Sequence, residues 1–283
     1  MKFIKLIISS LIVILGIYYG IKCYTYYSPA TYHPAYHTKR HYDDTIRIAF
    51  IGDSWALGHQ NHKCHISKIL TDNLKVPIKT ESYGIGGLTS KEIYNAIFEL
   101  EQFRMFMNNG YHYCIVSAGI NDTHKKMSKS YYKNSMNCII RFLIDNHIYP
   151  IILEIPDYNI YQAYNNQELY KKIIQCFSMF VNSTEMNCKQ QFRDALVELI
   201  KEKRYEGMVS IIPFKSWNKD YLKDLKTIYN IDQVHLNERG HQLLDSVMAR
   251  EICEDYVCHK HKSFAQEQQP QHLILPAKIS KSY

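Results

Sequence analysis

The chain has 283 residues, which is enough for one large domain or two small ones. Hydrophobic residues make up 46% of it and charged residues 22%, a composition that excludes a disordered or collagen-like chain. The formal net charge is +7, but lysine and arginine are spread along the chain without a basic stripe, so we expect no nucleic-acid partner.

Residues 1–24 are predicted to be a membrane anchor or a signal segment. Lys2 and Lys5 precede an uncharged apolar run at residues 6–21. A membrane span needs about 20 apolar residues, whereas the core of a signal peptide has about 7–15. The run favours an uncleaved, single-pass transmembrane helix, with a cleaved signal as the alternative. Because the lysines precede the run, we expect the rest of the chain to lie outside the cytoplasm.

The remaining chain divides into three parts by composition. Residues 25–44 lack apolar periodicity and contain two prolines, which is typical of a linker. Residues 45–258 carry the regular patterns of one folded domain. Residues 259–283 are polar and rich in glutamine, and they are predicted to form a loosely ordered tail.

Within residues 45–258, short apolar runs alternate with longer segments of helical periodicity. The predicted strands are Arg47–Ile51, Ile78–Ser82, Tyr111–Ser117, Tyr149–Pro156 and residues 207–214. The predicted helices are Ile66–Leu74, residues 89–106, Tyr131–Ile148, Leu169–Val181, Gln190–Lys203 and Glu238–Cys253. This alternation predicts an α/β fold, with a parallel five-stranded sheet covered by helices on both faces.

Polar or glycine-rich segments follow four of these strands. The first strand is followed by Ser54, the second by Gly87, the third by Asn121, and the fifth, after a helical stretch, by Asp232 and His235. Since the carboxyl ends of parallel strands meet at one edge of the sheet, we expect these residues to lie close together.

These residue types form a coherent set for acyl transfer. His235 can take the proton that makes the Ser54 hydroxyl a nucleophile, and Asp232 can orient the imidazole. The backbone N–H of Ser54, a backbone N–H at Gly87 and the amide of Asn121 can hold an oxyanion. This chemistry needs no cofactor and no metal. The structural alternatives are that Ser54 only caps a helix and that Asn121 only forms a turn.

The four segments resemble the sequence blocks of the SGNH, or GDSL-type, hydrolase superfamily. The blocks are Gly52-Asp53-Ser54, Gly87 within "GIGGLTS", Gly119-Ile120-Asn121-Asp122, and Asp232-Gln233-Val234-His235. The resemblance extends from about Arg47 to Cys253. It implies a flavodoxin-like three-layer α/β/α sandwich, a Ser54–His235–Asp232 triad, and an oxyanion hole of Ser54, Gly87 and Asn121. Asp53 is expected to support the turn, and Trp55 replaces the leucine of the family motif and is expected to shape the acyl pocket.

Histidines near Ser54 raise the alternative of a metal site. His59, His62, Cys64 and His65 are ligand types that zinc uses. Their spacing is loose and no second cysteine or carboxylate supports them, so we predict a solvated helix face, with His59 close to the cleft.

The chain has eight cysteines at irregular spacing and no CxxC pair, which speaks against a zinc ribbon. In an oxidising compartment Cys253 and Cys258 are the most plausible local disulfide. Cys114 lies in an apolar run and is predicted to be a buried free thiol.

The sequence therefore predicts a membrane-anchored serine esterase that removes acyl groups, such as acetyl, from an envelope or surface glycan. Its partners would be an acylated carbohydrate or another ester, and a membrane reached through residues 6–21. An O-acyltransferase would use the same triad to pass the acyl group to a sugar hydroxyl. A non-catalytic glycan-binding module is a further alternative, against which the intact set of site residues argues.

Overall fold

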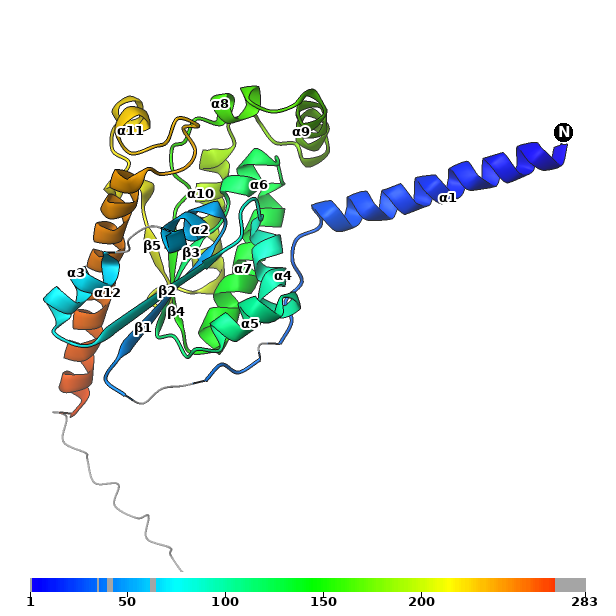
Figure 1. Cartoon of the computed structure of the whole chain (residues 1–283). Coiled ribbons are helices and arrows are strands. Elements are labelled where there is room, and N and C mark those ends of the chain that lie inside the picture. Colours follow the sequence, from blue (N-terminus) through cyan, green and yellow to red (C-terminus); the bar gives the residue numbers. More distant parts are fainter. Residues whose placement is uncertain (1, 35, 40–42, 62–64, 268–283) are drawn as a thin grey trace, which may run out of the picture.

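The computed structural model describes residues 2–34, 36–39, 43–61 and 65–267 (Figure 1). A long helix, α1 (Lys2–Tyr27), projects from a domain that is built around one sheet.

The sheet has five parallel strands in the order β2-β1-β3-β4-β5. The strands are β1 (Ile46–Gly52), β2 (Ile78–Gly84), β3 (Tyr113–Ser117), β4 (Tyr149–Leu153) and β5 (Ser210–Ile212). The predicted parallel five-stranded sheet is thus confirmed. The order reverses between β1 and β3, and it is beyond the carboxyl ends at such a point that open α/β sheets bind ligands.

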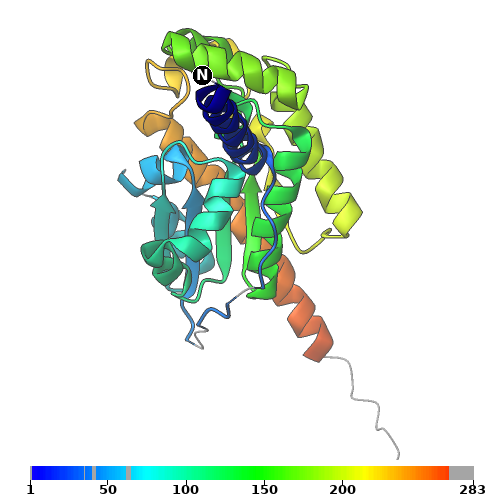
Figure 2. The same cartoon turned by 90° about the vertical axis from the view of Figure 1, so that its right-hand side faces the viewer.

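Helices cover both faces of the sheet and form a three-layer α/β/α arrangement (Figures 1 and 2). One face carries α2 (Ser54–Asn61), α3 (Ile66–Leu74) and α12 (Glu238–Glu267). The other carries α4 (Ser90–Glu99), α5 (Glu101–Met107), α7 (Lys129–Asp145) and α10 (Lys189–Lys203). The apolar periodicity predicted α3, α7, α10 and α12, whose buried stripes recur every three to four residues. It predicted α4 and α5 as one helix over residues 89–106, but the chain breaks at Leu100, which is extended.

Shorter helices gather near the carboxyl edge of the sheet, at the top of Figure 1. They are α6 (Ile120–His124), α8 (Ile160–Asn165), α11 (Tyr221–Thr227) and the 3₁₀ turn Phe214–Ser216, and they are joined by the longer α9 (Leu169–Asn182). One or two helical turns leave too few residues for a periodicity to be read, which is why α6 and α8 were not predicted.

From residue 9 on, the side chains of α1 are mostly apolar or aromatic and exposed. The exposed apolar and aromatic side chains are Leu11, Ile12, Val13, Ile14, Leu15, Ile17, Tyr18, Tyr19, Ile21 and Tyr24. Among the residues that the structure describes, no helix combines the length and the hydropathy needed to cross a membrane. The transmembrane helix predicted at residues 6–21 is therefore not supported by this structure.

The segment after α1 packs on the domain instead of hanging free as a linker. The backbone N–H of Ala30 donates to Ser135 Oγ of α7, and the backbone N–H of His33 donates to the Tyr94 hydroxyl of α4. The Tyr36 hydroxyl donates to the carbonyl of Ile97. These contacts join residues distant in sequence, so no local pattern could reveal them.

The C-terminal helix differs from its prediction in two ways. α12 continues to Glu267, beyond the predicted end at Cys253, because residues 254–267 contain neither glycine nor proline. Residues 268–283 of the predicted tail lie outside the described residues. Cys253 and Cys258 are free thiols, as is every cysteine in the described part of the chain, so their predicted disulfide is wrong. Five residues apart on one helix, their side chains leave different faces.

Phe142 joins the segment after α1 to the domain core. Its fully buried ring lies 5.3 Å from the ring of Tyr36 and 5.5 Å from that of Phe98. Phe142→Ala should lower the free energy of unfolding by about 3–5 kcal/mol, since the smaller side chain leaves a cavity. Urea denaturation of the variants and the unsubstituted protein in the same detergent measures the loss. Phe180→Ala is the control, because Phe180 is 85% exposed. Equal losses in the two variants would contradict this packing.

Candidate active site

Three predicted site residues form a hydrogen-bonded series at the carboxyl edge of the sheet. Ser54 Oγ lies 2.9 Å from His235 Nε2, and His235 Nδ1 lies 2.6 Å from Asp232 Oδ2. An ionised carboxylate only accepts, so Nδ1 carries the ring proton and Nε2 is left to accept from the serine hydroxyl. This is the tautomer that a general base for Ser54 requires.

Ser54 is the first residue of α2, in the tight turn that follows β1. The side chain before it, Asp53, is fully buried, and its Oδ1 accepts from the backbone N–H of Trp55 and from Ser117 Oγ, both at 3.0 Å. Burial raises the pKa of Asp53 to about 6, while these two hydrogen bonds oppose the rise. Asp53 thus ties the turn to the end of β3.

The turn also requires a glycine on the neighbouring strand. A Cβ at Gly84, the last residue of β2, would lie 2.1 Å from the backbone N of Leu57 and 2.6 Å from the carbonyl oxygen of Asp53. Only a residue without a side chain lets β2 approach the first turn of α2 this closely.

Asp232 orients His235 by more than one hydrogen bond. Its Oδ1 accepts from the backbone N–H groups of Val234 and His235, both at 3.0 Å, while its Oδ2 contacts the ring. Partial burial acts to raise the pKa of Asp232, but the hydrogen bonds with His235 and the backbone outweigh it and lower the pKa. The carboxylate is therefore ionised at neutral pH.

Trp55 does not line the cleft, contrary to the expectation that it shapes an acyl pocket. It is buried, and its Nε1–H donates to the carbonyl of Val234 at 3.2 Å, directly before His235. Its ring packs against Trp217 and Tyr229. The indole supports the loop that carries the histidine, a role that only a donor at the far end of the side chain can fill.

The candidate oxyanion donors Gly87 and Asn121 line the same cavity as Ser54. Gly87 has φ +80°, and a Cβ there would meet nothing within 4 Å, so its backbone faces open space. Asn121 is the second residue of α6 and donates one amide hydrogen to the carbonyl of Leu88 at 3.0 Å. This contact holds the two donor segments together and leaves the second amide hydrogen of Asn121 for a ligand.

Asp122 fixes these segments to α4 and was not predicted. Its carboxylate is fully buried and accepts from the backbone N–H of Ser90 at 2.8 Å and from Ser90 Oγ at 2.5 Å. Burial raises its pKa to about 7, and the hydrogen bonds from Ser90 counteract part of that rise. Its position directly after Asn121 in the third sequence block could have indicated a supporting role.

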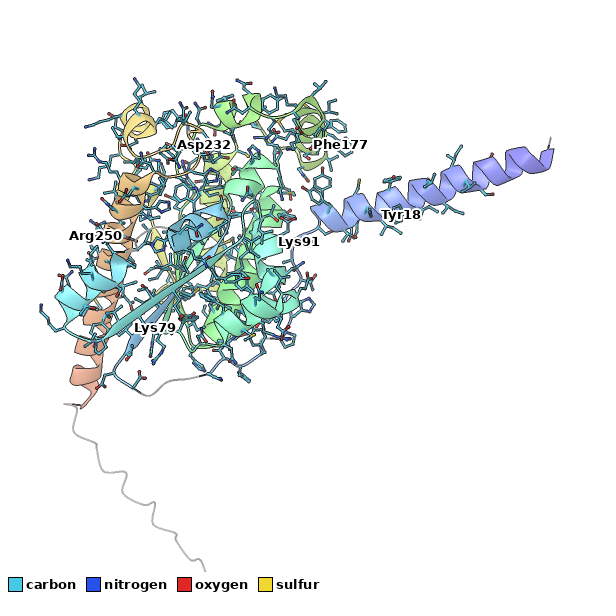
Figure 3. The ribbon with its side chains drawn as sticks, viewed as in Figure 1. Tyr18, Lys79, Lys91, Phe177, Asp232 and Arg250 are labelled. Carbon is cyan, nitrogen blue, oxygen red and sulfur yellow. The ribbon has the colours of Figure 1, made fainter. Side chains whose placement is uncertain are left out.

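Two neighbouring cavities meet at the oxyanion donors. The first, of about 500 Å³, is lined by Ser54, Gly86, Gly87, Ile120, Asn121, His124, Tyr158, Ala163, Asn166, Asp232, Val234 and His235. The second, of about 390 Å³, shares Gly87, Asn121 and His124 with the first. Lys125, Gln167 and residues of α1 and α9 complete its lining. The label of Asp232 in Figure 3 marks this edge of the domain. His124, which sequence patterns did not indicate, is largely buried, and its pKa is lowered to about 4 by that burial and by nearby lysines.

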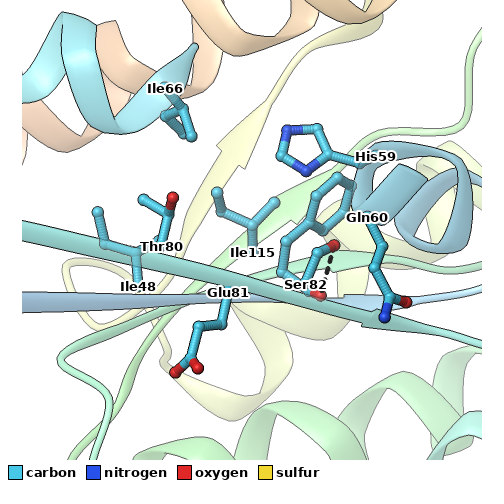
Figure 4. Close-up of a pocket in the computed structure, with 9 residues that line it drawn as sticks. Ile48, His59, Gln60, Ile66, Thr80, Glu81, Ser82 and Ile115 are labelled. Carbon is cyan, nitrogen blue, oxygen red and sulfur yellow. Dashed lines mark hydrogen bonds between the residues drawn. The ribbon is translucent and has the colours of Figure 1, made fainter. Parts of the chain in front are cut away.

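His59 is neither solvated nor in the cleft, so its predicted position is wrong. Its Nε2 lies 2.6 Å from Oδ1 of Asp245 on α12, and Oδ2 of Asp245 accepts from the backbone N–H of His65. His59 borders a separate cavity of about 130 Å³ between α2, α3 and the sheet (Figure 4). In the described residues no three potential ligands cluster around a metal position, and His62 and Cys64 lie outside those residues.

The site therefore combines a serine, a histidine and a carboxylate in series with candidate donors that line the same cavity, on a doubly wound α/β sheet. No protein-family model and no curated protein matches the sequence of this chain.

Solved structures with a similar fold include three bacterial proteins. One is a lipase/acylhydrolase from Enterococcus faecalis, with a TM-score of 0.51 and 11% identity over 74% of this chain and 96% of the other. A second is described as an acylhydrolase from Bacteroides fragilis, with a TM-score of 0.51 and 16% identity over 76% and 90%. A third is described as a lipolytic protein of the G-D-S-L family from Desulfitobacterium hafniense, with a TM-score of 0.50 and 16% identity over 72% and 98%.

The chain thus has the fold of the SGNH, or GDSL-type, hydrolases, and the predicted resemblance is confirmed at the level of the fold.

Because Asp53 is buried, the difference in unfolding free energy between this chain and its Asp53→Asn variant should depend on pH. The folded protein disfavours the charged carboxylate, so its pKa lies above the ordinary 3.8, at about 6. As the pH rises through this window, the chain should lose about 3 kcal/mol of unfolding free energy relative to the variant, and the loss then stays constant. Urea denaturation at steps from about pH 4 to about pH 7 measures it.

Asp72→Asn is the matched control, since Asp72 is exposed on α3. A stability difference for Asp53→Asn that does not change with pH would show that the carboxylate is not penalised by burial.

Proposed function

We propose that this protein is a serine ester hydrolase that acts through an acyl-enzyme on Ser54. The observation that carries the proposal is the series Ser54 Oγ–His235–Asp232, with distances of 2.9 Å and 2.6 Å, at the point where the strand order reverses. Its fold is shared with proteins described as acylhydrolases and a G-D-S-L lipolytic protein, which supports the choice of ester chemistry.

In the first half of the reaction, Ser54 Oγ attacks the carbonyl carbon of the ester while its proton passes to His235 Nε2. The C=O electron pair moves onto oxygen, and Asp232 stabilises the imidazolium that forms. When the tetrahedral intermediate collapses, the C–O bond to the alcohol breaks. The leaving oxygen takes the proton from His235, and the acyl group stays on Ser54.

In the second half, a water molecule attacks the acyl carbon and gives its proton to His235. Collapse of this intermediate returns the proton to Ser54 and releases the acid. A sugar hydroxyl in place of water would produce an acyl ester of the sugar instead, which is the O-acyltransferase alternative. A purely glycan-binding role would leave the ordered series of Ser54, His235 and Asp232 without a purpose.

The oxyanion of both intermediates is assigned to the backbone N–H of Ser54, the backbone N–H of Gly87 and the amide of Asn121. Ser54 starts α2, so its N–H lies at the positive end of that helix. Gly87 and Asn121 both line the 500 Å³ cavity that Ser54 also lines. Donors held in advance by the contacts of Asn121 and Asp122 stabilise developing charge without reorganisation.

The proposed substrate is an ester of a carbohydrate, and the proposed location is a membrane. An acylated carbohydrate of the cell envelope fits a cavity that combines apolar walls with the amides of Asn121 and Asn166. We place the protein at a membrane through residues 6–21, with the hydrolase domain outside the cytoplasm. The exposed apolar side chains of α1, which projects from the domain in Figure 1, and the lysines at positions 2 and 5 support this placement.

A fluorophosphonate probe should label Ser54 alone, as read by mass spectrometry of the digested protein. Ser54→Ala should abolish labelling and lower kcat on a small aryl acetate by about 10⁴-fold or more. Ser246→Ala on the exposed surface of α12 is the control and should leave both unchanged. Labelling at another residue, or an active Ser54→Ala protein, would refute the mechanism. Release of free acid in the presence of a glycan acceptor distinguishes hydrolysis from transfer.

Asn121→Ala should lower kcat by about 10²–10³-fold, or roughly 3–4 kcal/mol, with little change in KM, because the amide contact strengthens only in the transition state. Asn166→Ala tests the same cavity away from the oxyanion donors and should change KM more than kcat. If Asn121→Ala changes KM alone, Asn121 positions the substrate and is not an oxyanion donor.

A further inference from the structure

α9 is attached to the domain by its polar side. Gln175 and Ser178 are its two buried residues. Gln175 Nε2 donates to the carbonyl of His124 at 2.6 Å, and Asn182 Nδ2 donates to the carbonyl of Lys126 at 2.8 Å. An amphipathic helix on the surface of a soluble domain normally places its apolar side inward, so the orientation of α9 is inverted.

The apolar side chains of α9 point outward instead. The exposed ones are Leu169, Tyr170, Ile173, Ile174, Phe177, Phe180 and Val181. At about 100° per residue these seven positions fall on one continuous arc of the helix, opposite Gln175 and Ser178. We call them the apolar arc of α9. A contiguous apolar surface of this kind marks a contact with an apolar partner.

The position of the apolar arc beside α1 indicates its partner. The Tyr27 hydroxyl at the end of α1 lies 2.6 Å from Ser178 Oγ of α9. Lys91 Nζ donates to the carbonyls of Thr25 and Ser28 and thereby fastens the end of α1 to α4. α1, with its exposed apolar side chains, therefore leaves the domain beside α9.

The two helices are also oriented as membrane contact requires. α9 is seen end-on in Figure 1, where α1 runs across the picture, and it runs across Figure 2, where α1 is seen end-on. Both lie on the same side of the domain, and the label of Phe177 in Figure 3 marks that side. If α1 enters a bilayer, α9 lies along the surface of that bilayer. Lys171 and Lys172 on α9 can meet lipid head groups, as is typical of interfacial helices.

We propose that the apolar arc of α9 inserts into the interface of a lipid bilayer and holds the domain against the membrane. This inference rests on the proposed attachment through α1. It adds that the cavity bounded by Ile174 and Lys171 of α9, Tyr26 of α1 and the oxyanion donors Gly87 and Asn121 opens at the membrane surface. The ester that this site takes is then one carried by a lipid or presented at the bilayer.

Tryptophan fluorescence of the full chain in vesicles tests the insertion. Both native tryptophans are buried and give a constant background. Phe180→Trp adds a tryptophan on the apolar arc, and Leu222→Trp adds one at the 72% exposed position on α11. In phosphatidylcholine vesicles containing anionic lipid, the first should shift its emission to the blue. Lipids brominated on their acyl chains should quench it, whereas the Leu222→Trp protein should show neither effect.

The outcomes separate this inference from the attachment through α1. If Phe180→Trp protein sediments with the vesicles but its emission is unchanged, the attachment stands and the insertion of α9 is refuted. If the protein does not sediment with vesicles, both are refuted. A blue shift that grows with protein concentration without lipid would show that a second copy covers the arc, and it would also refute the inference.

Activity tests the position of the cavity. The triple variant Ile173→Gln, Phe177→Gln and Phe180→Gln removes apolar residues that do not line it. The variant should act normally on a soluble aryl acetate and lose activity several-fold on an acyl ester embedded in vesicles. Leu222→Gln with Ile231→Gln, two exposed apolar positions elsewhere, is the matched control. Full activity on the embedded ester, or an equal loss on both substrates, would refute presentation of substrate at the bilayer.

Discussion

The position of Ser54 depends on the buried carboxylate of Asp53. Burying a carboxylate is costly unless donors meet it, and here the Trp55 N–H and the Ser117 hydroxyl do so. These donors belong to α2 and β3, so the same group that needs them also fixes the turn between β1 and α2 to the neighbouring strand. The serine hydroxyl is thereby held at the point where the strand order reverses, with little freedom to turn away from the cleft.

The histidine reaches the serine across 181 positions of sequence, yet its loop is held from the same turn. Trp55, the residue after Ser54, donates to the carbonyl of Val234, the residue before His235. A second support comes from Asn159, whose backbone N–H and side-chain amide contact Gln233 at 3.1 Å and 2.6 Å. Of three consecutive residues, Asp53 thus fixes the turn, Ser54 carries the hydroxyl and Trp55 supports the loop of His235.

Much of the fold and the candidate site follows from local sequence. The strands are short apolar runs, and Ser54, Asn121 and His235 follow strands at the edge where parallel sheets bind ligands. Contacts between distant segments could not be predicted in this way. His59 is buried by its pairing with Asp245, although its polar sequence neighbours predicted a solvated position. The role of Trp55 depends on the carbonyl of Val234, far along the chain. α9 was predicted as a helix because its apolar residues recur at helical spacing. That spacing does not say which side of the helix faces the domain.

Under the proposed function, the inverted α9 would give the two ends of an ester different surroundings. Gly87 and Asn121 border both cavities, so a carbonyl held between them has one cavity that leads past Ser54 and His235 and another that leads to α9 and α1. After the alcohol leaves, the space beside His235 must be refilled before the acyl group can leave Ser54, because the base needs a hydroxyl to deprotonate. Water needs no binding site of its own to react there, whereas a sugar acceptor must be bound beside His235. Under the proposed mechanism, the walls beside His235, including Asn166 and Val234, would therefore decide between hydrolysis and transfer.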